Sequence, residues 1–275
     1  MTHYPNELKL LNLESLPREV FVRQRYMPAR HHFPAHTHKW HQLLYASSGV
    51  LIVDVIGERL FIPPDNAVWL PCGCQHSVST EYGAELKSLY IDAKYQQLPT
   101  DKSLVLKISS IIKALIIEIS TFDVEYPISG YADDVVSLML NTLPRLKHLT
   151  DHLPWPTSSD LLKMCSQLYE QPGGKQTTLM LAENLAMSKR TLERKFHRET
   201  GMTIQAWSLR LRFLKAIGLL TAGHSITSIS LDLGYSSSSP FIYMFRNISG
   251  MSPGEYIASL SNKKEKHSSS ISTTG

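Results

Sequence analysis

Short runs of apolar residues alternate with turn residues between residues 18 and 92. Five of these runs are rich in β-branched, aromatic or leucine side chains, and breaks such as Ser48-Gly49 and Pro63-Pro64 separate them. Several short strands with regular breaks are typical of an all-β barrel or sandwich. The predicted strands cover residues 42–45, 50–56, 59–62, 67–70 and 85–91.

The spacing of the apolar residues becomes helical after residue 100. A first predicted helix carries a stripe of leucine and isoleucine, and a second runs from Tyr131 to Leu143. We expect a helical hairpin whose apolar face packs on the β domain, pairs with another copy of the chain, or does both. The stripes are Leu104, Ile108, Ile111, Ile112, Leu115, Ile116 and Ile119 in the first helix and Val135, Leu138, Met139 and Leu143 in the second.

The stretch Leu153–Ser159 contains two prolines and several small polar residues, which predicts a linker. Beyond it the pattern is helical as far as about Asn262, where a polar, serine-rich tail begins that we expect to be disordered. The chain is therefore predicted to be of the α+β class. Its expected parts are a β domain with a helical hairpin over residues 1–153, an all-α domain over 154–262 and the tail over 263–275.

Length and charge are compatible with two domains and a nucleic-acid partner. A chain of 275 residues suits two domains. Residues 1–155 carry 14 Lys and Arg against 16 Asp and Glu, a net charge of −2, whereas residues 156–275 carry 14 against 8, a net charge of +6. Basic charge concentrated in the helical half favours a phosphate-facing surface, although solvated helix faces can give the same balance.

The cysteines and the apolar runs bear on the compartment. Cys72, Cys74 and Cys165 are an odd, sparse set that does not resemble a disulfide framework, which favours a reducing cytoplasm. The first 14 residues carry acids and lack a long apolar core, so we expect no signal peptide. No apolar run approaches the roughly 20 residues that a membrane helix needs.

A short helix, a tight turn and a second helix are predicted over residues 181–197. Ser188 is placed to cap the second helix by accepting backbone N–H bonds. Leu192 and Phe196 lie four residues apart and face inward, so the opposite face is polar and basic. Arginine on such a face can bond a guanine edge through two donors, worth about 1–3 kcal/mol of discrimination. The residues predicted to face DNA are Ser188, Lys189, Arg190, Glu193, Arg194 and His197.

A second unit of the same kind is predicted over residues 226–246, with Gly234 at its turn. Its outward face is poorer in charge, so we expect weaker base readout here. Ile242 could contact a thymine methyl group, and Tyr243 or Arg246 a phosphate. The predicted face consists of Ser238, Ser239, Ile242, Tyr243 and Arg246.

Residues 203–220 are predicted to form an amphipathic connector between the two units. A helix of 18 residues spans about 27 Å, which suits two recognition helices held near one turn of DNA apart, about 34 Å. The apolar stripe consists of Ile204, Trp207, Leu211, Leu214 and Leu219, and Arg210, Arg212 and Lys215 make the connector basic.

Residues from about Asp160 to Leu260 resemble the AraC/XylS family of bacterial transcription regulators. The resemblance implies a module of two helix-turn-helix subdomains that controls nearby genes, such as a transporter, efflux or catabolic gene, as an activator or a repressor. The family usually has a basic residue where Tyr243 stands and commonly Ala where Ser230 stands, and the first departure leaves base contact by the second unit open. The matching residues are Leu181, Ala182, Ser188, Thr191, Leu192, Arg194, Phe196, Gly201, Arg210, Arg212, Ala216, Leu219, Leu220, Ile226, Ile229, Leu233, Gly234, Tyr235, Ser239, Phe241, Phe245, Gly250, Met251, Ser252 and Pro253.

Six of the 12 histidines lie within residues 31–76. They belong to a pattern that resembles the cupin barrel, namely His36-x-His38-x-x-x-Gln42, then Gly49, then Pro71-x-Gly73-x-x-His76. In metal-binding cupins two histidines, a glutamate and a later histidine surround one ion, whereas the weaker ligand Gln42 stands here at the glutamate position. The resemblance implies either a divalent metal site at His36, His38 and His76, with imidazole suiting zinc, iron, nickel or copper, or histidines that only form hydrogen bonds.

Barrels of this kind in the family commonly hold a small effector, so the resemblance also implies an effector site inside the barrel. Aromatic and convergent polar side chains would suit a small amphipathic or aromatic molecule. The candidate lining residues are His36, His38, Trp40, Gln42, Trp69 and His76.

These patterns predict a cytoplasmic, dimeric transcription regulator and not an enzyme. A cupin-like barrel with a helical hairpin would precede an all-α domain of two helix-turn-helix subdomains joined by a long helix. An effector that binds one conformation of the barrel better would shift the population of DNA-competent chains. The expected partners are double-stranded promoter DNA, a small effector, a second copy and, for an activator, RNA polymerase. Two alternatives are a metal-dependent cupin enzyme fused to a DNA-binding domain, and a constitutive DNA-binding protein with a purely structural barrel.

Overall fold

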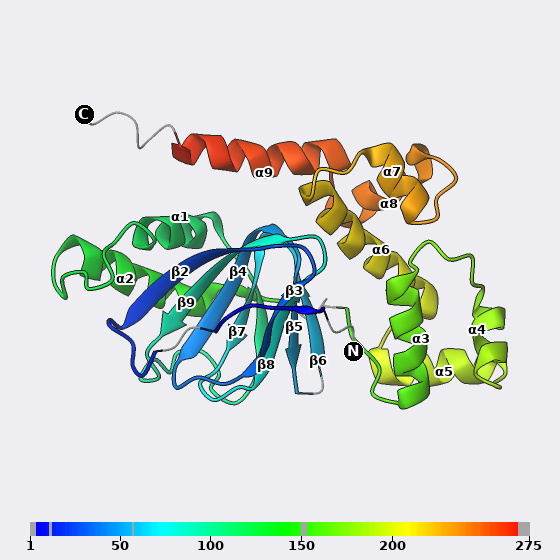
Figure 1. Ribbon diagram of the computed structural model, residues 1–275, viewed down its shortest axis with the longest axis horizontal. Coiled ribbons are helices and arrows are strands. Elements are labelled where there is room, and N and C mark those ends of the chain that lie inside the picture. The colour runs from blue at the N-terminus through cyan, green and yellow to red at the C-terminus, as the bar shows by residue number, and fades with distance from the viewer. Residues whose placement is uncertain (1–3, 11–12, 57, 150–152, 269–275) are drawn as a thin grey trace. The chain divides into compact units, whose positions relative to one another are not determined.

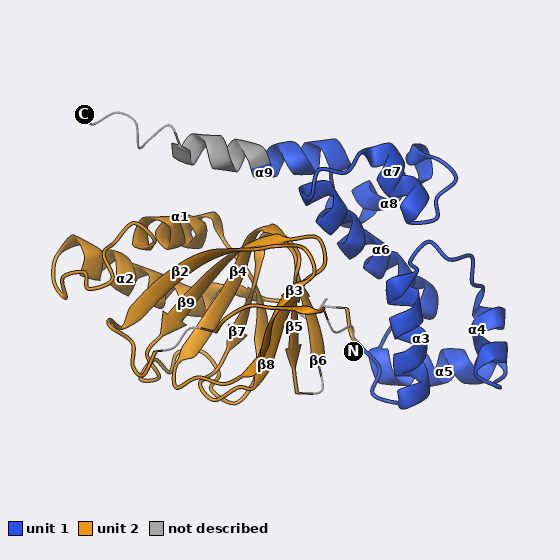
Figure 2. Ribbon diagram, in the orientation of Figure 1, with its two compact units in different colours: residues 1, 155–275 blue, residues 2–154 orange. Residues whose placement is uncertain are grey.

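The computed structural model describes residues 4–10, 13–56, 58–149 and 153–268, with side chains as far as Leu260. The chain divides into two compact units, residues 2–154 and residues 155–275 (Figure 2). The first unit contains two β-sheets and a pair of helices, and the second is helical (Figure 1). The predicted α+β class, with a β domain before a helical domain, is therefore confirmed. The division between the units lies inside the stretch predicted to be a linker.

The strands of the first unit pair into two sheets. Each of the five strands predicted from the sequence is present, as β4, β5, β6, β7 and β9, and β2, β3 and β8 complete the strand-rich stretch. One sheet has the order β1-β3-β8-β5-β6 and the other the order β11-β10-β7-β4-β9-β2. The strands are β1 (Asn6–Glu7), β2 (Val20–Met27), β3 (His31–His36), β4 (His41–Gly49), β5 (Leu51–Val55), β6 (Glu58–Ile62), β7 (Asn66–Leu70), β8 (His76–Thr80), β9 (Ala84–Ile91), β10 (Leu104–Lys107) and β11 (Lys147–His148).

The helical hairpin begins later than its apolar spacing predicted. Leu104–Lys107 forms β10, which pairs antiparallel with β7, so the prediction that the helix begins at Leu104 was wrong. Val105 and Leu106 point to opposite sides of this strand, and both are buried. Pairing with β7 and burial on both faces outweigh the helical spacing of the local sequence. The helices are α1 (Ser110–Ile119), which begins after the capping residue Ser109, and α2 (Tyr131–Thr142), which a short 3-10 turn, η1 (Leu143–Arg145), follows.

Two apolar cores lie on the two faces of the six-stranded sheet. Successive residues of a strand point to opposite faces, so Leu44 packs between the sheets while its neighbour Leu43 packs with α1 and α2. The hairpin lies against this outer face of the sheet (Figure 1), where Ile112 and Met139 are fully buried. The predicted packing of the hairpin on the β domain is what the structure has.

The second unit contains two helix-turn-helix motifs joined by a long helix. Hydroxyl side chains cap three of its helices, each by accepting the backbone N–H of the residue three positions later: Ser188 caps α5, Thr203 caps α6 and Ser225 caps α7. At the other end, α5 and α8 stop at Gly201 and Gly250, which adopt the left-handed conformation. The helices are α3 (Ser159–Glu170), α4 (Thr178–Asn184), α5 (Lys189–Thr200), α6 (Ile204–Thr221), α7 (Ile226–Asp232), α8 (Ser238–Ser249) and α9 (Pro253–Ser268).

The C-terminal end of the chain departs from its prediction in part. Helix α9 continues to Ser268, into the stretch 263–275 for which the sequence predicted a disordered tail. Residues 269–275 lie outside the described part of the chain. Within the described residues, none of the helices combines the length and the apolar character required to cross a bilayer.

Candidate DNA-reading helices and effector cavity

Helix α5 separates its buried and exposed residues sharply. Leu192 and Phe196 are fully buried on one side. Within the helix, Arg190, Arg194 and His197 recur at intervals of four and three residues, which places them on the opposite side. All six residues predicted to face DNA on this helix are exposed: Ser188, Lys189, Arg190, Glu193, Arg194 and His197.

Helix α8 has the same design with a less charged face. Phe241 and Phe245 are fully buried, and Tyr243 is 71% exposed. Ser239 and Arg246 are also exposed, whereas Ser238 and Ile242 are half-buried. The structure therefore brings the predicted residues of α8 to one side of the helix, and only Arg246 among them is charged.

The connector helix α6 contacts both of these helices through aromatic side chains. Trp207, near its start, meets Phe196 of α5 edge to face, with ring centroids 6.1 Å apart. Phe213, two turns later, packs against Phe245 of α8 at 5.0 Å. Because both contacts are to fully buried rings of the two helices, α6 holds the α5 and α8 faces in a defined relation.

Two of the three basic residues predicted along the connector are used inside the unit. Lys215 is 5% exposed, and its Nζ lies 3.6 Å from the centroid of the Tyr169 ring. The Arg212 Nε donates to the carbonyl oxygen of Pro172 at 2.8 Å, and its guanidinium lies 5.7 Å from the Tyr235 ring centroid. The sequence showed that these residues are basic, but it did not show that they contribute to packing.

The loop after α3 lies directly on the turn between α7 and α8. A Cβ atom at Gly173 would lie 2.5 Å from the carbonyl oxygen of Asp232, and one at Gly234 would lie 2.5 Å from the carbonyl oxygen of Gly173. Gly234 also has a φ of +82°, which other residues rarely adopt. Only glycine fits at these two positions without a shift of the backbone, so the second motif is packed closely against the loop that follows α3.

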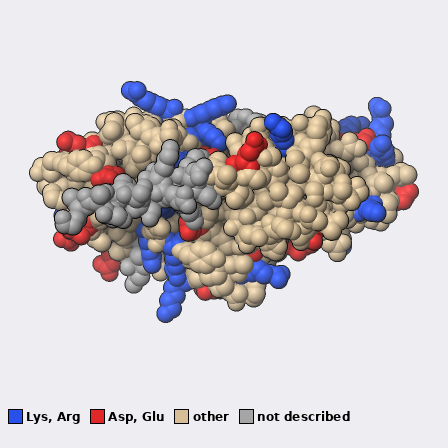
Figure 3. Space-filling view, turned by 90° about the horizontal axis from the view of Figure 1, so that it is seen from above, with Lys and Arg blue, Asp and Glu red and all other residues tan. Residues whose placement is uncertain are grey.

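On the face shown in Figure 3, Lys and Arg side chains are scattered with Asp and Glu among them. The net positive charge of residues 156–275 is not gathered into one patch on that face.

The first unit contains a cavity of about 970 Å³ between its two sheets. Five of the six residues predicted to line an effector site do line it: His36, His38, Trp40, Gln42 and His76. Trp69 does not. It is fully buried on the other face of β7, where its Nε1 donates to the carbonyl oxygen of Pro99 at 2.8 Å. Side chains alternate along β7, and Val68 and Leu70 are the ones that face the core between the sheets. Trp69 therefore faces the helices, and the prediction that it lines the cavity was wrong.

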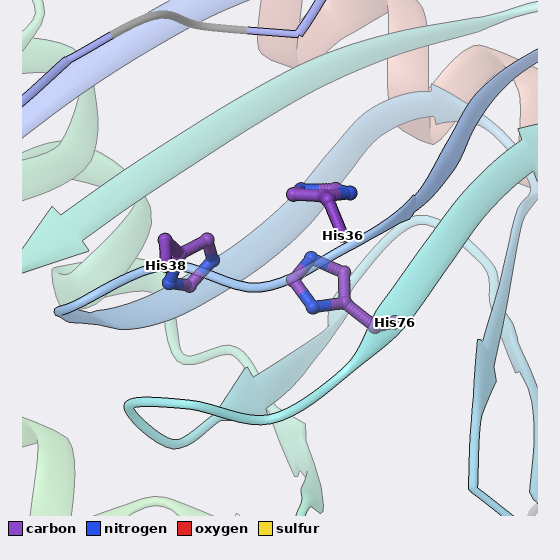
Figure 4. Close-up of side chains that lie close together, drawn as sticks. All are labelled: His36, His38 and His76. Atoms are coloured by element: carbon purple, nitrogen blue, oxygen red, sulfur yellow. The ribbon is translucent and has the colours of Figure 1, made fainter.

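Three histidines converge in this cavity (Figure 4). A ring nitrogen from each of His36, His38 and His76 lies within 4.8 Å of the others. The Nδ1 atoms of the three rings lie 2.8, 2.7 and 3.0 Å from the backbone carbonyl oxygens of Pro34, Trp40 and Cys74. A carbonyl oxygen can only accept, so each Nδ1 carries a proton, and each Nε2 of a neutral ring presents a lone pair.

Burial favours the neutral form of His36 and His76. Burial lowers the pKa of His76 to about 3 and that of His36 below its usual value, and the other histidines of the group add to both effects. His76 is 1% exposed, and its Nε2 has no hydrogen-bond partner in the described part of the chain. A buried acceptor without a partner is costly, and it is a place where a ligand donor or a metal ion would be stabilised.

The third histidine is held by the glutamine of the cupin-like pattern. The His38 Nε2 lies 2.9 Å from the side-chain oxygen Oε1 of Gln42, and the Gln42 Nε2 donates to the hydroxyl of Ser88 at 3.0 Å. Both nitrogens of His38 thus face oxygen acceptors, the carbonyl of Trp40 and the amide oxygen of Gln42. A neutral His38 with its proton on Nδ1 bonds to Gln42 only when the amide is flipped, so that its N–H points at Nε2 and its oxygen accepts from Ser88. Gln42 therefore supports His38 as a hydrogen-bond partner.

Two cavity residues were not predicted from the sequence. Arg23 and Arg25 lie on β2 and both line the cavity. The alternation that places them is visible in the run Val20-Phe21-Val22-Arg23-Gln24-Arg25. Val20 belongs to the core on the outer face of the sheet, so the two arginines, at odd-numbered positions, point to the opposite face. The strands predicted from the sequence begin at residue 42, so β2 was not among them.

Comparisons with known proteins match both units. The AraC-like ligand binding domain family matches residues 20–106, and a helix-turn-helix domain family matches residues 181–259. The HTH-type transcriptional regulator NimR of Escherichia coli (strain K12) is 30% identical over 227 residues, which cover 82% of this chain and 83% of NimR. The HTH-type transcriptional activator RhaS of Escherichia fergusonii is 40% identical over 76 residues, 27% of each chain. Among solved structures, ToxT from Vibrio cholerae is similar with a TM-score of 0.36 and 12% identity, over 87% of this chain and 98% of ToxT.

Proposed function

The chain belongs to the AraC-like transcriptional regulators, and from this premise we propose that α5 and α8 read promoter DNA while the cavity of the first unit holds a small effector. The chain has an AraC-like ligand-binding domain followed by a helix-turn-helix DNA-binding domain. The observation that carries the proposal is the face of α5, where Arg190, Arg194 and His197 are exposed opposite the buried Leu192 and Phe196.

The division of labour between the two helices follows from their chemistry. Arg190 and Arg194 offer forked donors for guanine edges, so α5 would supply most of the sequence discrimination. Ser239, Tyr243 and Arg246 offer hydroxyl groups and one cation, which suit phosphate and fewer base contacts. In this proposal α8 contributes affinity and register more than specificity.

Substitution of Arg194 tests the proposal. Arg194→Ala should weaken binding to a specific site, selected from random duplexes with the wild-type chain, by about 5- to 150-fold, the loss expected for about 1–3 kcal/mol of base contact. Binding to random DNA should weaken much less. Lys163→Ala serves as the control, because Lys163 is an exposed cation on α3. Equal losses on both kinds of DNA would show that Arg194 contacts phosphate only.

We also propose that the three cavity histidines bind one divalent ion. Three imidazoles suit zinc, nickel, copper or iron. The carbonyl bonds at each Nδ1 are the outer contacts that orient metal-binding histidines, and the orphaned Nε2 of His76 supplies a vacant lone pair. A bound ion would tie β3, β8 and the loop before β4 together, which would give a regulator a metal-responsive conformation.

Calorimetric titration of the full chain with zinc or nickel tests this second proposal. We expect one ion per chain, and we expect His76→Gln and His36→Gln each to weaken its binding at least tenfold, since each removes a ligand. His148→Gln is the matched control, because His148 is an exposed histidine of the same unit. Binding with equal affinity in all variants, or no binding at one ion per chain, would contradict a site at these histidines.

The proposed function implies further partners. We expect two copies of the chain to act together, RNA polymerase to be contacted where the chain activates, and neighbouring transporter, efflux or catabolic genes to be controlled. Promoter binding would also place the chain in the cytoplasm. A reporter fused to each flanking promoter, with and without the chain, tests the regulated gene and the sign of regulation.

A further inference from the structure

The cavity of the first unit has an unbalanced charge. Its lining contains the cationic side chains of Arg23, Arg25 and Lys39, against the carboxylate of Glu14 alone among the described lining residues. No Asp or Glu in the described part of the chain lies within ion-pair distance of Arg23 or Arg25. The cavity therefore has positive charge that the described residues do not neutralise.

The sheet register brings the two arginines to the cavity. Arg23 pairs with Ser88 and Arg25 with Leu86 across β2 and β9, and both partners also line the cavity. Phe21 pairs with Tyr90 in the same ladder, and Tyr90 lines the cavity beside them. Because β2 is the edge strand of its sheet, the two arginines lie at one side of the cavity. The neighbouring strands β9 and β4 contribute lining residues next to them.

The two guanidinium groups are held differently. The Arg25 Nη1 donates to the carbonyl oxygen of Lys9 at 3.0 Å, and its guanidinium lies 5.3 Å from the Phe33 ring centroid. Arg23 forms no hydrogen bond or ion pair with another described residue. Arg25 is thus oriented by its surroundings, whereas the donors of Arg23 are available to a ligand.

The remaining walls define the rest of the ligand. Leu44, Val78 and Leu86 are apolar, and Trp40 and Tyr90 meet edge to face with ring centroids 5.9 Å apart. An apolar or aromatic body suits these walls. A half-buried guanidinium next to apolar walls is poorly solvated. Two parallel hydrogen bonds from it to the two oxygens of an anionic group on the ligand would therefore be strong.

We propose that the cavity takes an organic acid, whose carboxylate pairs with Arg23 and Arg25 and whose apolar or aromatic body lies against Trp40 and Tyr90. This inference rests on the proposed effector site and specifies its chemistry. His36 and His76 lie on β3 and β8, in the other sheet. His38 lies in the loop before β4, where its ring stacks on Trp40 with centroids 5.5 Å apart and meets Tyr90 at 6.0 Å, so it borders the body of the acid. Burial raises the pKa of Tyr90, so its phenol stays a neutral donor next to the acid.

Three probes that share a naphthalene ring test the proposal on the full chain: 2-naphthoate, its neutral amide, and 2-naphthyl phosphate. Binding is followed by calorimetry. We expect 2-naphthoate to bind at least tenfold more tightly than the amide, because only the acid makes the charge-assisted contact. Arg23→Gln should remove this preference by weakening the acid and leaving the amide within twofold. Tighter binding of the phosphate than of 2-naphthoate would show that the subsite is built for a phosphate ester, which would overturn the assignment to a carboxylate.

The controls separate the possible failures. Arg145→Gln removes an exposed arginine of the same unit and should bind as the wild type does. Arg23→Gln is preferred over a change of Arg25, which also holds the Lys9 carbonyl. Equal affinity for the acid and the amide, an unchanged preference in Arg23→Gln, or no saturable binding of 2-naphthoate would overturn the proposal. Binding of the same preparations to the selected DNA site is measured alongside, so a loss of the regulatory function itself is recognised separately.

Discussion

Individual residues of the cavity show what strand patterns can predict. The cupin-like spacing identified His36, His38 and His76, because a motif fixes residues that must meet. It could not place Trp69, since alternation shows which residues share a face but not which face meets the cavity and which meets the helices. Arg23 was missed for a different reason: the predicted strands began at residue 42, so β2 was not among them.

At the same scale, one ion pair predicts a pH dependence of stability. The Lys195 Nζ lies 2.5 Å from a carboxylate oxygen of Asp160, and this hydrogen bond lowers the pKa of Asp160 to about 2. A folded-state pKa below the unfolded value, about 3.9, means that the ionised group stabilises the fold above pH 4. That contribution is lost as the pH falls toward 2.

Asp160→Asn should therefore have a lower denaturant midpoint than the wild type at pH 7, and the difference should shrink as the pH falls from about 4 to about 2. Both side chains of the pair are about a quarter exposed, so we expect a modest effect. Glu170→Gln, an exposed acid on the same helix, is the control. A difference between Asp160→Asn and the wild type that stays constant down to pH 2 would rule out this role.

The elements of the second unit were largely predictable, because caps and turns are local. Ser188 caps α5 as predicted, and the predicted connector is α6, which ends one residue later, at Thr221. The strand β10 was not predictable, because its pairing with β7 depends on a partner more than 30 residues away. The contact of Gly173 with Gly234 was equally hidden, since neither residue carries a side chain whose pattern could reveal it.

That contact leads to a prediction about the two motifs. Gly173→Ala places a Cβ 2.5 Å from the Asp232 carbonyl oxygen, so the loop or the turn must move, and overpacking of this kind costs about 1–3 kcal/mol. Besides a lower unfolding temperature, we expect a several-fold loss of affinity for the full selected DNA site but little change for a duplex that contains only the α5 half. Gly254→Ala, whose Cβ would meet nothing within 4 Å, is the control. Full-site affinity equal to the wild type in Gly173→Ala would show that this contact does not position α8.

At the scale of the whole molecule, composition indicated two parts with different partners, and the structure divides the chain into residues 2–154 and residues 155–275. The net charge of +6 of residues 156–275 is a sum over 22 charged residues. The proposed recognition surface depends on only a few of these residues. Lys195 and Lys215 are basic in the sequence but lie against Asp160 and Tyr169 inside the unit. Only the fold separates such internal cations from the exposed face of α5.

The central claim is that α5 and α8, joined by the 18 residues of α6, read one duplex from one side. Hydroxyl-radical footprinting of the chain on its selected site tests it most directly. A helix of this length spans about 27 Å, so we predict two protected segments about one helical turn, or 10 base pairs, apart on the same face of the duplex. A single protected segment per chain, or two segments on opposite faces, would contradict the claim.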